Sequence, residues 1–336
     1  MVHGHSTGLS PIAVVASATF WTALWGPIGL VLATPLTVCL VVLGRHVERL
    51  EFLDVLFGDR PSLSPPEMFY QRMLAGDPTE AAEKAEAFLK DRPLSAYYDE
   101  VALKGLQLAQ FDANRGVLHQ ERLERIKAAI DEFVSDLSDG EAIPPKAHKS
   151  NNPEAPSAVE GNDDHGESEY LPILAKAELP SEWQGEHPVL CVAGRSLLDE
   201  AAAVMLAHLS TSHGLTARVE PAEALSTASL FRLDIKGVVL VCLVYLDISS
   251  PAHMRYSVRR LRRKSPQATI MLNCWAKDLD QTELEKLRES AGADLAAASP
   301  SEAIRMIIEA TAMRNDAEKN PSRVQATESS GTRRQA

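Results

Sequence analysis

Residues 187–200, HPVLCVAGRSLLDE, contain the strand and the helix start that decide the fold of the second half of the chain. The run HPVLCVAG is short, apolar and free of Asp, Glu, Lys and Arg, which is typical of a strand in a parallel sheet. Ser196 stands three residues before Asp199, the spacing of a hydroxyl cap and an acid at a helix start. This order predicts the beginning of a βαβ unit.

The same alternation continues to about residue 315 and predicts an α/β domain over residues 183–315. Expected strands cover residues 187–194, 216–222, 237–246, 268–275 and 293–299. Expected helices cover residues 197–212, 251–264, 282–291 and 300–313. We therefore expect a doubly wound, flavodoxin-like parallel sheet with the strand order 2-1-3-4-5.

Ligands of such folds bind beyond the carboxyl ends of the strands, so the loops there hold the candidate site. The candidate ligand- or anion-binding residues are Arg195, Ser196, Asp247, Ser249, Ser250 and Asn273. Arg195 and the helix start at Ser196 would offer a cation and free backbone amides to an anion. Because these loops contain no recognisable nucleophile–base pair, we expect a binding module and not an enzyme.

In outline the domain resembles cobalamin-binding and receiver domains. VAGRSLLDE lacks the D-x-H-x-x-G run that supplies the histidine of the cobalamin-binding domains. Asp247 ends the third strand where a receiver holds its phospho-acceptor, but no acids end the first strand and no lysine ends the fifth. The chain also lacks a G-x-G-x-x-G or Walker motif, so no cofactor is predicted.

The run RRLRRK, residues 259–264, is the most concentrated basic stretch and falls at the end of an expected helix. Cations at that position favour the helix C-terminus, so we interpret the run as a solvated face. Contact with anionic lipid or with a phosphorylated partner is the functional alternative.

Residues 47–137 have helical signals, and a periodic set of apolar residues predicts three or four antiparallel helices that act as a scaffold or docking module. Residues 138–182 are rich in Pro, Ser, Asn, Gly and acids, which predicts a flexible acidic linker, and the tail 316–336 is expected to be disordered. His148 and His165 lie in the linker without ligand spacing on a fixed element, so no metal site is predicted.

The chain begins with a stub, residues 1–8, and then an apolar segment, residues 9–46, without Asp, Glu, Lys or Arg before Arg45. This length exceeds the roughly 20 residues that cross a bilayer, so the segment predicts one or two membrane spans, broken near Pro27. Arg45 and Arg49 follow the segment, which would place the later domains in the cytoplasm.

Residues 9–59 resemble the C-terminal end of the autoinducer-2 exporter-like permeases, whose last segments contain a W-G-x-x-G turn and an A-x-P-L stretch. The residues that carry the resemblance are Trp25, Gly26, Gly29, Ala33, Pro35, Leu36, Gly44 and Arg45. The resemblance implies the terminal part of a transporter in the inner membrane, surrounded by lipid and by other membrane helices of a split permease or a homo-oligomer.

The composition of the chain limits which classes of function remain. The net charge of -12 disfavours a general nucleic-acid binder, and four widely spaced cysteines indicate reduced thiols. Two hypotheses follow. The chain is the terminal part of a permease with cytoplasmic regulatory domains, or it is a membrane-anchored sensor or docking protein whose α/β domain binds a ligand or a cytoplasmic protein partner.

Overall fold

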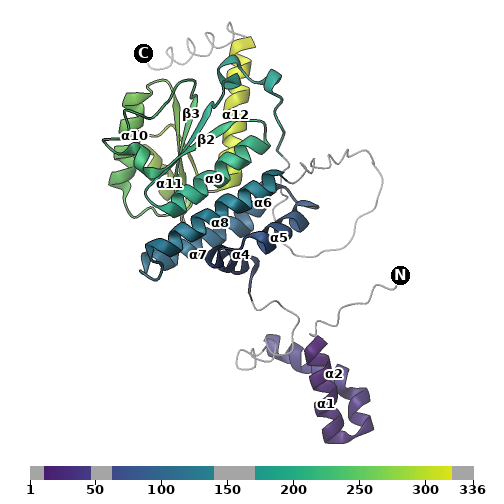
Figure 1. The fold of residues 1–336 in the computed structure, drawn as a ribbon. Helices are drawn as coiled ribbons and strands as arrows, with labels where there is room; N and C mark the ends of the chain where they lie inside the picture. The colour runs from purple at the N-terminus through teal and green to yellow at the C-terminus, as the bar shows by residue number, and fades with distance from the viewer. Residues whose placement is uncertain (1–10, 47–62, 140–170, 320–336) are drawn as a thin grey trace, which may run out of the picture. The chain divides into compact units, whose positions relative to one another are not determined.

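A computed structural model describes residues 11–46, 63–139 and 171–319 (Figure 1). The chain divides into two compact units, Met1–Ser64 and Pro65–Ala336. Each unit is described separately below.

The first unit contains a pair of helices, α1 (Pro11–Trp25) and α2 (Pro27–His46). Gly26 lies between them with φ +66°, a left-handed conformation that glycine adopts without a steric cost. Gly29 packs against the backbone of Trp21, where an added Cβ would lie 1.9 Å from the Trp21 carbonyl oxygen. The W-G-x-x-G sequence therefore forms the corner between two packed helices.

The prediction of a membrane segment is wrong. Among the residues that the structure describes, no helix is both long and apolar enough to cross a bilayer. The corner at Gly26 divides the apolar run into helices of 15 and 20 residues, the second with Pro35 inside it, so no single helix continues through the run. The predicted permease function, the inner-membrane location and the membrane anchor of the alternative hypothesis all depended on such a span, so they are withdrawn.

Other residues of the proposed membrane motif belong to the contact between the two helices. Ala33 is buried, and the Trp21 indole nitrogen Nε1 donates a 3.2 Å hydrogen bond to Thr37 Oγ1. Leu36 is half-buried on the same helix. Gly44 and Arg45 lie near the end of α2, where only the backbone is described.

The α/β domain has the predicted topology. Its five strands are β1 (Val189–Ala193), β2 (Ala217–Glu220), β3 (Leu240–Tyr245), β4 (Thr269–Cys274) and β5 (Leu295–Ala297). All pair in parallel in the order β2-β1-β3-β4-β5. The predicted strand order is therefore confirmed, and each predicted strand contains an observed one.

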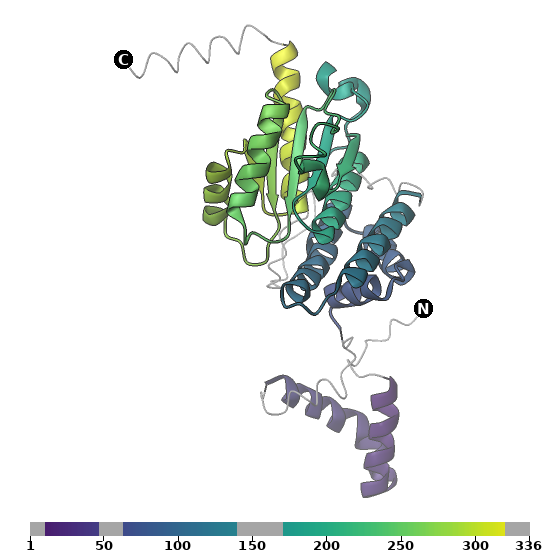
Figure 2. The same ribbon diagram turned by 60° about the vertical axis from the view of Figure 1, so that its left-hand side comes forward.

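Helices cover both faces of this sheet (Figures 1 and 2). On one face lie α9 (Leu197–Ser212) and α12 (Pro300–Lys319), and on the other lie α10 (Pro251–Lys264) and α11 (Gln281–Ala291). Alternate residues of β3 separate the two cores: Cys242 faces the α9 side and Leu243 the α10 side. This double cover explains why the strands are apolar on both faces.

The predicted helical region, from Pro65 onward, forms a bundle that packs on the α9 face of the sheet, and its residues 47–62 lie outside the described residues. We call residues Pro65–Asp139 the helical module. It contains α4 (Pro65–Ala75), α5 (Thr79–Leu89), α6 (Leu94–Tyr97), the π-helical turn η2 (Tyr98–Ala102), α7 (Leu103–Asn114) and α8 (Gln120–Asp139). One continuous hydrophobic core joins the module to α9, α12 and the sheet. The module and the α/β domain therefore form one folded unit.

Two predicted boundaries differ from the observed ones. Residues 140–170 of the predicted linker lie outside the described residues, but its last part packs on the domain: Leu174 N donates to His213 O at 3.0 Å, and Leu179 is buried. The short helices η3 (Lys176–Glu178) and η4 (Ser181–Gln184) form here. Helix α12 extends to Lys319, and residues 320–336 of the predicted tail lie outside the described residues.

Candidate functional site

The carboxyl ends of β1 and β3 mark the switch point of this sheet, because α9 follows β1 on one face and α10 follows β3 on the other. The loop after β1 contains Gly194, Arg195 and Ser196. The start of this loop lies beside β3, since Gly194 N donates to Val244 O at 2.9 Å. This is the place where the fold usually binds ligands.

Asp199, in the first turn of α9, fills the space between these two loops. Its Oδ2 atom accepts hydrogen bonds from the backbone amides of Arg195 (2.8 Å) and Ser196 (3.0 Å). Its Oδ1 atom accepts one from the amide of Leu246, directly after β3, at 2.7 Å. The carboxylate therefore connects both sides of the switch point.

The sequence prediction covered only part of this arrangement. Ser196 Oγ accepts from Asp199 N at 3.1 Å, so the predicted capping box at the start of α9 is confirmed. The amides of Arg195 and Ser196, expected to be free for an anion, are instead paired with Asp199. Burial raises the pKa of the Asp199 carboxyl, while the hydrogen bonds from Leu246, Arg195 and Ser196 lower it.

The acidic residue of the loop after β3, Asp247, is also paired within the domain. Asp247 accepts two hydrogen bonds from Ser249, one from its amide at 2.8 Å and one from its hydroxyl at 2.7 Å. Ser250 begins α10 without a side-chain cap. Asp247 thus stabilises its own turn, as short polar side chains commonly do.

Tyr245 and His253 also belong to this edge, although no sequence pattern selects them. The Tyr245 hydroxyl lies 3.3 Å from His253 Nδ1, and the ring of Tyr245 lies under Gly194, where a Cβ would come within 2.3 Å of it. Burial lowers the pKa of His253, and the nearby charge of Arg195 lowers it further. Arg195 itself is exposed, and no hydrogen bond or ion pair of its guanidinium is found within the described part of the chain.

Asn273 lies apart from the other predicted site residues. It is fully buried in β4, on the face toward α9 and α12, and neither its Oδ1 nor its Nδ2 atom has a hydrogen-bond partner among the described residues. Trp275, two residues further on the same face, is also fully buried, and its Nε1 atom has no hydrogen-bond partner in the described part of the chain. The structure therefore brings Arg195, Ser196, Asp247, Ser249 and Ser250 to the carboxyl edge of the sheet. Asn273 is instead buried between the sheet and the helices that cover it.

The α9 face makes polar contacts with the helical module that sequence reasoning did not predict. The Tyr98 hydroxyl lies 2.6 Å from His208 Nδ1 on α9. Asp99 accepts from Ser301 N (3.1 Å) and from Ser299 Oγ (3.2 Å) at the start of α12. Both module residues come from the π-helical turn η2, which directs two consecutive side chains to different helices of the α/β domain.

Metal binding finds no support in these contacts. Across residues 11–46, 63–139 and 171–319, no three His, Cys, Asp or Glu side chains are grouped so that they could hold a metal ion. His148 and His165 lie outside these ranges.

The sheet topology and the contacts at its carboxyl edge define a doubly wound α/β domain with a helical module packed on one of its faces. No family model and no curated protein matches the sequence, so the resemblance to permeases gains no support. Among solved structures, the chain is similar to a cobalamin-binding protein from Desulfitobacterium hafniense DCB-2, with 9% identity and a TM-score of 0.30. The similarity covers 72% of this chain and 97% of that protein, and at this level it does not extend to a ligand.

Proposed function

We propose that this chain is a non-catalytic binding protein whose α/β domain contacts an anionic ligand or partner at the carboxyl edge of its sheet. The observation that carries the proposal is the bridge made by Asp199. In enzymes of this fold the switch point receives the substrate, whereas here a buried carboxylate joins the Arg195, Ser196 and Leu246 amides across it.

The other polar groups at this edge support the same role. The two oxygens of Asp247 pair with Ser249, and Tyr245 is buried beneath Gly194. Arg195 is an exposed cation directly after β1, and a guanidinium can bind a phosphate or a carboxylate with two parallel hydrogen bonds. A group used in this way supplies binding and orientation, without the nucleophile and base that catalysis would need.

The test uses the full chain and pyrophosphate as the probe, with isothermal titration calorimetry for binding and ³¹P NMR for turnover. We expect Arg195→Gln to weaken binding at least fivefold. Lys84→Gln, which removes an exposed cation from α5 of the helical module, is the matched control and should leave binding unchanged. Equal binding by the parent and Arg195→Gln would remove this edge from the proposal, and hydrolysis of the probe would overturn the non-catalytic role.

A further inference from the structure

Helix α10 contains six arginine and lysine residues, and they fall into two groups of three. The first group is used inside the domain. Arg260 donates to Leu225 O at 2.5 Å and to Thr227 Oγ1 at 2.9 Å, and Lys264 donates to Phe231 O at 3.1 Å. Arg262, the third member, belongs to a larger set of contacts.

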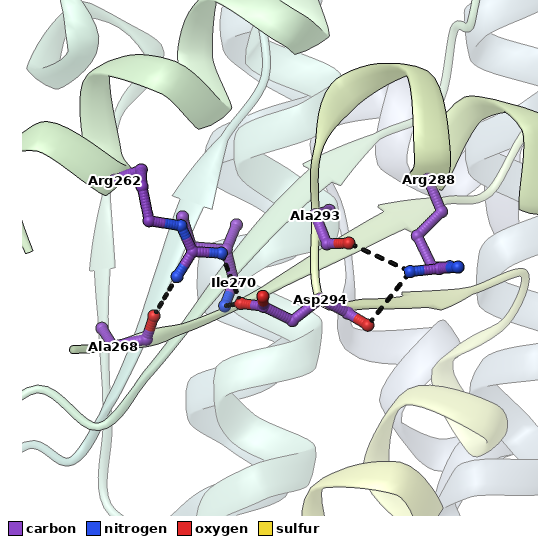
Figure 3. Close-up of polar contacts among 6 residues, drawn as sticks. All are labelled: Arg262, Ala268, Ile270, Arg288, Ala293 and Asp294. Atoms are coloured by element: carbon purple, nitrogen blue, oxygen red, sulfur yellow. Dashed lines mark hydrogen bonds and ion pairs between the residues drawn. The ribbon is translucent and has the colours of Figure 1, made fainter. Parts of the chain in front are cut away.

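Arg262 fastens the end of α10 to the sheet (Figure 3). Its guanidinium donates to Ala268 O at 2.9 Å and to Asp294 Oδ2 at 2.6 Å, and the same carboxylate oxygen accepts from Ile270 N at 2.7 Å. Arg288, from α11, donates to the carbonyl oxygen of Ala293 at 3.2 Å beside this cluster. Arg262 therefore has a structural role that explains its presence.

The second group has no such role. Arg255, Arg259 and Arg263 are exposed, and none of them makes a hydrogen bond or an ion pair with any described residue. We call these three residues the α10 basic stripe. Their spacing of four residues places them on one side of the helix, over about 12 Å at a rise of about 1.5 Å per residue.

Local structure does not account for this stripe. Like charges four residues apart on a helix repel each other, so the spacing opposes helix formation. The helix dipole favours a cation in the last turn, which explains Arg263 but not Arg255 or Arg259. A side-chain pattern that costs stability without a local compensation is typical of a functional surface.

Two exposed aromatic side chains accompany the stripe. Tyr256 is 50% exposed on α10 and lies under the guanidinium of Arg260, 4.7 Å from the ring centroid. Phe231 is 84% exposed, and its carbonyl oxygen accepts the hydrogen bond from Lys264 at the other end of the helix. Arginine and aromatic residues are the types most enriched at the energetic centres of protein interfaces.

We propose that the exposed face of α10 is a docking surface for an acidic segment of a partner protein. The arginines of the stripe would pair with its carboxylates, while Tyr256 and Phe231 would contact its apolar side chains. A nucleic acid fits less well, because a long polyanion would also meet the rest of a chain whose net charge is -12. This inference rests on the proposed non-catalytic binding role and assigns to it a second surface, separate from Arg195.

The test measures binding of the full chain to a fluorescein-labelled helical peptide, with glutamates at every fourth position and leucines beside them, by fluorescence anisotropy. The variant is Arg255→Gln/Arg259→Gln/Arg263→Gln. The matched control is Lys104→Gln/Lys277→Gln/Arg305→Gln, which removes three exposed cations from α7, the loop after β4, and α12. Both variants change the net charge equally, so non-specific attraction should affect them alike.

We expect the stripe variant to bind the peptide at least tenfold more weakly than the parent, and the control variant to bind within twofold of it. No binding by the parent, or an equal loss in both variants, would overturn the docking surface. Tighter, stripe-dependent binding of a uridine oligonucleotide or of phosphatidylserine vesicles would assign the surface to another partner class and also overturn it. The Arg195 experiment is unaffected by any of these results, so the two proposals fail separately.

Discussion

Acid should weaken the contact between the helical module and α9 through a single histidine. His208 lies on α9, and its Nδ1 atom is 2.6 Å from the hydroxyl of the fully buried Tyr98. Burial lowers the pKa of His208 from 6.5 to about 4. The folded protein therefore keeps His208 neutral at pH values where the unfolded chain would protonate it.

The sign and the size of the effect follow from this difference. Because the folded-state pKa is the lower one, the stabilisation is fully present above pH 6.5 and is lost as the pH falls toward about 4. At about 1.4 kcal/mol per pH unit, His208 should remove about 3 kcal/mol from the free energy of unfolding between pH 7 and pH 4. Burial raises the pKa values of Asp99 and Asp199, and these groups act in the opposite direction.

Since several groups contribute, the assay compares the parent with His208→Asn by urea unfolding at pH 7 and at pH 4. Asparagine keeps an acceptor near the Tyr98 hydroxyl but does not titrate. Between pH 7 and pH 4, the free energy of unfolding of the parent should fall by about 3 kcal/mol more than that of the variant. His119→Asn removes an exposed histidine and is the matched control, expected to follow the parent. A parent and a His208→Asn variant with the same pH dependence would refute the reasoning.

Three further predictions concern the α/β domain. Asp199→Asn leaves at least one buried amide at the switch point without an acceptor. The free energy of unfolding, measured in urea, should therefore fall by about 1–3 kcal/mol. Gly194→Ala forces a Cβ against the Tyr245 ring and should cost about 1–3 kcal/mol, with partial recovery in Gly194→Ala/Tyr245→Leu; additive losses would contradict the clash. A thiol reagent should label only Cys39 in the folded chain, because Cys191, Cys242 and Cys274 are buried; burial raises the pKa of Cys274 to about 12. Rapid labelling of a second thiol would disprove that burial.

The topology of the α/β domain could be predicted because its signals are local. Each strand is a short apolar run, and the starts of α9 and α12 are marked by a hydroxyl cap with an acid three residues later, as at Ser196 and Asp199. The right-handed connection of parallel strands then leaves few arrangements of five strands. Strand order and helix positions therefore followed from the sequence without any knowledge of long-range contacts.

The contacts that shape the candidate site could not be predicted in this way. Asp199 was recognisable as a helix cap, but its bond to Leu246 joins residues far apart in the chain. Tyr98 and His208 are separated by 110 positions, and neither has a pattern that indicates the other. Asn273 was expected at the edge because its strand ends nearby. Side chains point alternately to the two faces of a sheet, however, and the Asn273 side chain points into the core.

The apolar N-terminal segment shows the limit of composition as a guide. Its charge-free length predicted a membrane span, but length counts only if the helix continues through it. Gly26 with positive φ ends α1, and the close approach of Gly29 to Trp21 fixes the corner. Proline and glycine in WGPIG indicated this break, and the structure shows that the break separates the segment into two helices.

The position of the helical module determines which surface of the α/β domain is left for a partner. The module packs on α9 and reaches α12 through Asp99, so the α9 face of the sheet is covered within the unit. On the opposite face, α10 and α11 carry the second core, and α10 presents its basic stripe outward. A module that braces one face and leaves arginines unpaired on the other is consistent with a docking role, because the braced sheet holds those arginines at fixed spacing before a partner arrives.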